Sequence, residues 1–92
     1  MTDHITPERA EILALEALGW LVGRPEAIDR FLAVSGLSVQ DLRQAAGNPD
    51  LLGSVLDFLL ANEPLLLDFC RDASTSTKAV HLARHRLEAL CG

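Results

Sequence analysis

The stretch FLAVSGLSVQDLRQ, residues 31–44, predicts two short helices joined by a glycine corner. Gly36 is suited to end the first helix, because glycine adopts the left-handed conformation of a helix C-terminus without steric cost. Ser38 and Asp41 have the spacing of an N-cap residue and the third residue of the helix that it caps. Leu37, between Gly36 and Ser38, is expected to insert into the core. This stretch therefore predicts a helical protein with tight corners.

The same corner, residues 28–46, also resembles a helix-turn-helix, in which the second helix reads DNA bases. Its exposed side chains would include Gln40, Arg43 and Gln44, and glutamine and arginine can recognise adenine and guanine. However, Leu32 stands where the two helices of such a motif cross closely, and it is bulky for that position. We favour a structural corner and expect a protein-interaction or homo-oligomeric module. The alternative function is a nucleic-acid-binding regulator that uses this corner or the basic C-terminal helix.

Similar signals divide the rest of the chain into helices. Proline follows a capping residue at Thr6-Pro7 and at Asn48-Pro49, as expected at helix starts. Strand signals are absent, because no alternating apolar run occurs and tyrosine is missing. We expect an all-α, compact single-domain bundle of five to six short helices, formed by residues 1–92 with its core in 7–90. Further helix starts are expected at Pro25, at Asn62-Glu63-Pro64 and within Ser74–Thr77, and stops are expected at Gly23, Gly36 and Gly47.

The helix that begins at Pro7 carries apolar residues around most of its circumference, which predicts a central position in the bundle. Apolar residues make up 49% of the chain, and the six glycines raise this fraction to about 55%, above the 45–50% of an average soluble domain. Two interpretations remain open: a leucine-rich monomeric core, or apolar surface shared with a partner or a second copy. We expect such a surface near the fourth and fifth helices.

The net charge of −5 opposes general affinity for nucleic-acid phosphates. The last helix is locally basic, and this face could bind an acidic partner or the acidic body of another copy. Trp20, the single tryptophan, is either a core residue or an interface anchor. The candidate protein-binding residues are Trp20, Lys78, His81, Arg84 and His85.

Catalytic and metal-binding patterns are weak. His81 and His85 share a helix face, but no further ligand clearly converges on them, so we expect two solvated histidines and no metal site. No phosphate-binding loop occurs, and Ser35-Gly36 follows no strand, unlike a nucleophile elbow. We therefore expect no enzyme, no catalytic residues and no cofactor.

The sequence indicates a cytoplasmic location. Its first residues lack the basic and apolar segments of a signal peptide. The most apolar zone, residues 51–70, is interrupted by charged residues and proline, so we expect no membrane span. Cys70 is expected to pack as a small hydrophobic residue and Cys91 to be free, because two cysteines make no disulfide framework.

Three stretches carry a resemblance to a known family: ALEALGWL (14–21), RFLAVSGLSVQDLR (30–43) and VLDFLLANEPLLLDFC (55–70). Through them the chain resembles an uncharacterised family of small all-helical bacterial proteins, domain of unknown function 3572. The resemblance covers roughly residues 8–72. It implies an all-helical cytoplasmic protein and no assigned activity, so it supplies no catalytic residues.

Overall fold

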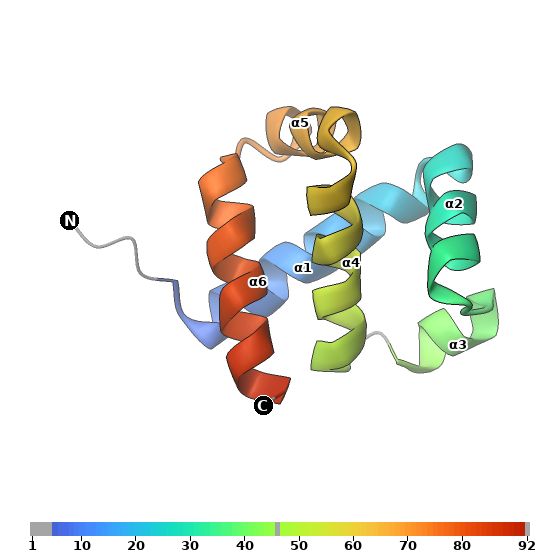
Figure 1. The fold of residues 1–92 in the computed structure, drawn as a ribbon, viewed down its shortest axis with the longest axis horizontal. Coiled ribbons are helices and arrows are strands. Elements are labelled where there is room, and N and C mark those ends of the chain that lie inside the picture. Colours follow the sequence, from blue (N-terminus) through green and yellow to red (C-terminus); the bar gives the residue numbers. More distant parts are fainter. Residues whose placement is uncertain (1–4, 46, 92) are drawn as a thin grey trace.

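The computed structural model describes residues 5–45 and 47–91 and contains six helices in that part of the chain (Figure 1). This confirms the all-α prediction. The helices are α1 (Pro7–Val22), α2 (Pro25–Ser35), α3 (Val39–Gln44), α4 (Pro49–Ala61), α5 (Glu63–Asp72) and α6 (Thr77–Cys91).

The predicted helix starts are confirmed by their hydrogen bonds. Thr6 Oγ1 accepts from the Arg9 amide, and Asn48 Oδ1 accepts from the Asp50 amide. Ser38 and Asp41 form a complete capping box, in which each side chain accepts from the backbone of the other. These bonds satisfy amide groups that have no partner inside their helices, which fixes where each helix begins.

The end of α2 agrees with the prediction, and the end of α3 differs from it. Gly36 has the expected left-handed conformation, with φ of 76°, and its amide donates to the Leu32 carbonyl. In contrast, α3 ends at Gln44, with Ala45 as its C-cap, before the stop expected at Gly47. Ala46, expected to face inward, lies outside the described residues.

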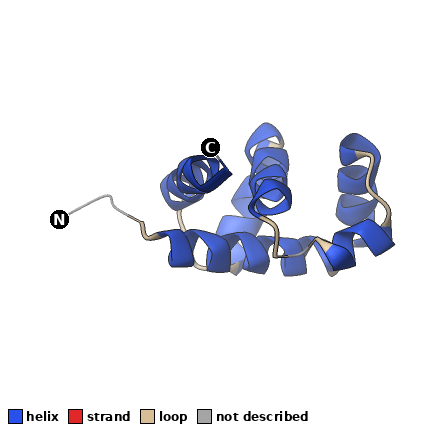
Figure 2. Cartoon of the chain, turned by 90° about the horizontal axis from the view of Figure 1, so that it is seen from below, coloured by secondary structure: helices blue, strands red, loops and turns tan. Residues whose placement is uncertain are grey.

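The helices form two layers. α4 and α6 lie side by side and cross the same side of α1, and α2 stands further along on that side (Figures 1 and 2). The molecule extends over 40 × 28 × 17 Å, so it is flat. Its accessible surface of 5569 Å² exceeds the roughly 5,200 Å² expected for a chain of this mass.

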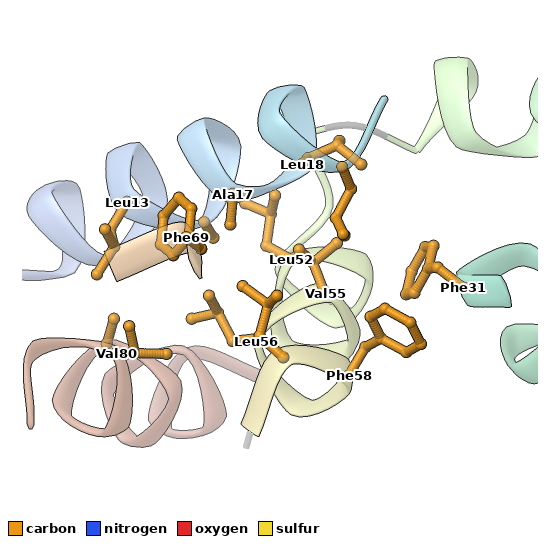
Figure 3. Close-up of a cluster of buried hydrophobic side chains, with 14 of the residues drawn as sticks. Leu13, Ala17, Leu18, Phe31, Leu52, Val55, Leu56, Phe58, Phe69 and Val80 are labelled. Carbon is orange, nitrogen blue, oxygen red and sulfur yellow. The ribbon is translucent and has the colours of Figure 1, made fainter. Parts of the chain in front are cut away.

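The core lies between the layers and is centred on α4. Leu52, Val55, Leu56 and Phe58 of α4 meet side chains from α1, α2 and α6 (Figure 3). Phe58 and Phe31 pack edge to face, with ring centroids 5.5 Å apart. Cys70 is buried and is a free thiol, as predicted, and burial raises its pKa. The side chains of residues 90 and 91 lie outside the described part, so the expectations for Leu90 and Cys91 stay predictions.

The prediction that α1 is central is wrong for one of its faces. Its inner side chains are buried, but Ile12, Leu15 and Val22 on the opposite side are 44%, 44% and 55% exposed. Figure 2 shows α1 along one edge of the molecule, with no described helix beyond it. The buried residues of α1 are Ala10, Leu13, Ala14, Ala17, Leu18 and Leu21.

Candidate functional site

Trp20 of α1 contacts two residues of α5. Its indole Nε1–H donates to Asp72 Oδ2 over 2.9 Å, and its ring meets the ring of Phe69 edge to face, with centroids 5.6 Å apart. The side chain is partly buried and packs against the core. Trp20 thus connects residues 52 positions apart, with its ring packed against the core and its polar end on Asp72.

Arg24 completes this cluster from the junction of α1 and α2. Its guanidinium lies 4.2 Å from the centroid of the Trp20 ring, and one N–H donates to the same Asp72 oxygen over 2.8 Å. The hydrogen bond from Trp20, followed by that from Arg24, lowers the pKa of Asp72. The cluster of Trp20, Arg24 and Asp72 therefore ties α5 to the first two helices.

The candidate residues of α6 do not form one basic face. Lys78, His81 and His85 are exposed and follow a spacing of three and four residues, which places them on one side of the helix. Arg84 instead faces α4, where its Nε donates to Asp57 Oδ1 over 2.6 Å. Its Nη1 also lies 3.8 Å from Oε1 of Glu88, one turn further along α6.

The Arg84 guanidinium passes over Gly53 of α4. A Cβ atom added to this buried glycine would lie 3.5 Å from Arg84 Nη1, which is an ordinary van der Waals contact. Arg86 points elsewhere again, and its Nε donates to the Ile5 carbonyl over 3.1 Å. The cations of α6 are thus divided among three directions.

No group of three or more potential metal ligands occurs within residues 5–45 and 47–91. His81 and His85 are exposed, and the expectation that this pair forms no metal site stays a prediction. In the same ranges, no helix has the length and hydropathy needed to cross a membrane.

The corner between α2 and α3 exposes a mixed surface. Val39 is 57% exposed, and Gln40, Arg43 and Gln44 are exposed as well. α3 has six residues, with one cation, Arg43, and one anion, Asp41, whose side chain is used in the capping box. Since phosphate contacts need cations, nucleic-acid binding at this corner stays a prediction without a further observation in its favour.

Two surface hollows flank α2. One, of about 520 Å³, is lined mainly by the start of α2 and includes Arg24, Arg30 and Leu65. The other, of about 480 Å³, lies between α2 and α4 and includes Val34 and Phe58. The residues that line these two hollows include no histidine or cysteine, and the second hollow is also lined by Ser35, Ser54 and Asp57.

Among the side chains that the structure describes, α1 exposes more large apolar ones than any other helix. We define the outer face of α1 as Ile12, Leu15, Gly19 and Val22, which follow one another at spacings of three, four and three residues. The expected location near α4 and α5 is wrong for α4, whose large apolar side chains are buried or partly buried. It holds in part for α5, where Leu67 is 52% exposed.

In the residues that the structure describes, the chain is a single all-α domain. The chain belongs to the family whose model, described as a protein of unknown function (DUF3572), matches residues 7–89. No curated protein and no solved structure matches the chain. The family confirms the resemblance found in the sequence and assigns no activity.

Proposed function

We propose that this chain acts by binding protein, and that its binding surface is the outer face of α1. The observation that carries the proposal is the exposure of Ile12, Leu15 and Val22, about half of each side chain, on one continuous side of one helix. Single exposed apolar residues are common on proteins, but three aligned along nearly three helical turns form an apolar strip. Covering this strip would remove apolar surface from water, which is the main driving force of protein association.

A binding role fits the rest of the molecule better than a catalytic one. Trp20 and Arg84, two of the predicted binding residues, are engaged in contacts within the chain. The exposed Lys78, His81 and His85 lie on α6 and offer a second, polar surface to an acidic partner.

We also propose a cytoplasmic location, because Cys70 is a free thiol in a chain with two cysteines.

The test compares capture of binding partners by three versions of the full chain. Ile12→Glu/Leu15→Glu places two charges on the outer face of α1. Val34→Glu/Val39→Glu adds the same charge at exposed apolar positions of α2 and α3. We expect the first variant to lose partners, including other copies of the chain, that the wild type and the second variant retain. Equal capture by all three proteins would refute the role of α1.

A further inference from the structure

The outer face of α1 has the spacing of a coiled-coil seam. Residues 12, 15, 19 and 22 occupy alternating a and d positions of two heptads, which is the narrow stripe typical of a contact between two helices. The buried residues of α1 form a separate, wider stripe on the opposite side. α1 therefore carries one apolar stripe for its own core and a second one suited to a helix from outside.

Gly19 lies within this seam and has no role inside the described chain. A Cβ atom at Gly19 would have no atom within 4 Å, and its φ is not positive. Glycine in the interior of a helix is less stable than alanine, so the position costs stability without improving the packing of the monomer. A glycine on a helix surface does allow another helix to approach closely.

The seam is self-complementary when two copies of α1 run antiparallel. In a heptad pair of that direction, a positions meet d positions, so Leu15 of one copy packs on Gly19 of the other, and Ile12 packs on Val22. A parallel pair would instead place glycine opposite glycine and leave a gap. Around a two-fold axis, Leu15 of each copy thus fills the space left by Gly19 of the other copy.

Charge along α1 favours the same direction. Glu8 and Glu11 lie in the first half of α1 together with the cation Arg9, Glu16 lies in the second half, and residues 17–22 carry no charge. Antiparallel pairing places the acidic end of each helix beyond or beside the uncharged end of its partner, whereas parallel pairing aligns acid with acid. Opposed helix dipoles also favour the antiparallel pair.

We propose that the occupant of the outer face of α1 is a second copy of this chain, paired antiparallel through Leu15 and Gly19. This inference rests on the proposed function and adds the identity and direction of the partner. One pair of helices buries much less than the roughly 1,600 Å² of a standard interface, so we expect a weak dimer. The two Glu16 side chains flank the seam close to the two-fold axis and repel each other, which contributes to this weakness.

Sedimentation equilibrium of the full chain from about 10 µM to about 1 mM tests the pairing. We expect a monomer–dimer equilibrium that Ile12→Glu/Leu15→Glu weakens at least tenfold and that Val34→Glu/Val39→Glu leaves within twofold. Gly19→Gln fits the monomer, where its side chain meets open space, and weakens dimerisation at least tenfold while raising the unfolding temperature. Gly19→Gln keeps the test valid if Ile12→Glu/Leu15→Glu does not fold. Glu16→Gln tightens the dimer severalfold.

Disulfide formation tests the direction. In a Cys91→Ser background, an equimolar mixture of Leu15→Cys and Gly19→Cys chains is oxidised at about 1 mM. Random pairing of equal amounts of the two chains would give the mixed disulfide in twofold excess over each symmetric product. We expect the mixed disulfide, which joins position 15 of one chain to position 19 of the other, in much more than this twofold excess. A mixed product at or below the twofold excess would overturn the antiparallel register. A wild type that stays monomeric to about 1 mM would overturn self-pairing. The proposed function would survive that result if partner capture still depended on Ile12 and Leu15, and it would fail if capture did not.

Discussion

Ser74, in the connection from α5 to α6, offers a direct test of the backbone geometry. Among the described residues other than glycine, it alone has a positive φ, of 53°. The surrounding bonds are those of a Schellman motif, with the Thr75 amide 2.9 Å from the Cys70 carbonyl and the Ser74 amide 3.4 Å from that of Arg71. Ser74 thus occupies the position at which helices most often carry glycine.

Ser74→Gly is expected to stabilise the protein. A left-handed conformation costs a residue with a Cβ atom about 1–2 kcal/mol, and the greater freedom of glycine in the unfolded chain takes back about 0.5–1 kcal/mol. The expected net gain is about 0.5–1 kcal/mol, or roughly 3–6 °C in Tm for a domain of this size. Urea unfolding followed by circular dichroism, together with a thermal scan, measures both quantities.

Two controls accompany this measurement. Ser74→Ala keeps the Cβ atom and the strain, so its stability should stay within about 0.5 kcal/mol of the wild type. Gly36→Ala introduces the same strain at a φ of 76° with no atom near the added Cβ, so it should cost about 1 kcal/mol. A Ser74→Gly variant no more stable than the wild type would refute the reasoning.

Two further predictions concern the core and the Trp20 cluster. Leu56→Ala, at a fully buried position, should cost about 2–5 kcal/mol in urea unfolding, whereas Leu15→Ala on the outer face should cost less than about 1 kcal/mol; similar losses would contradict the assigned burial. Because the pKa of Asp72 is lowered in the folded state, the stability that its contacts contribute is present near neutral pH and is lost as the pH falls below about 4. The stability difference between wild type and Asp72→Asn should therefore shrink from about pH 7 to about pH 2, and a constant difference would contradict this linkage.

Local signals in the sequence predicted the helices well. The caps at Thr6, Ser38 and Asn48 and the left-handed Gly36 depend on residues within a few positions of each other, so a short stretch contains all the information. The end of α3 was placed too late, because Ala45 closes the helix by its own backbone bond to Asp41 without a glycine.

Long-range contacts were not predictable in this way. Asp72 and Arg24 were missed, since the bonds that bring them to Trp20 and to each other span 52 and 48 residues and leave no local pattern. Arg84 faces Asp57 on another helix, 27 residues away in the sequence. In α1, leucine and isoleucine occur on both sides, so the periodicity did not show which side meets the core.

Chemical-shift changes on dilution test self-pairing through α1 most directly, because they locate self-association on individual residues. Backbone amide spectra of the full chain are compared between about 1 mM and about 20 µM. We expect the largest shift changes at Ile12, Leu15, Gly19 and Val22, and we expect them to disappear in the Gly19→Gln variant. Spectra that do not change with concentration, or changes that are largest on α6 or along the hollow between α2 and α4, would contradict pairing through the outer face of α1.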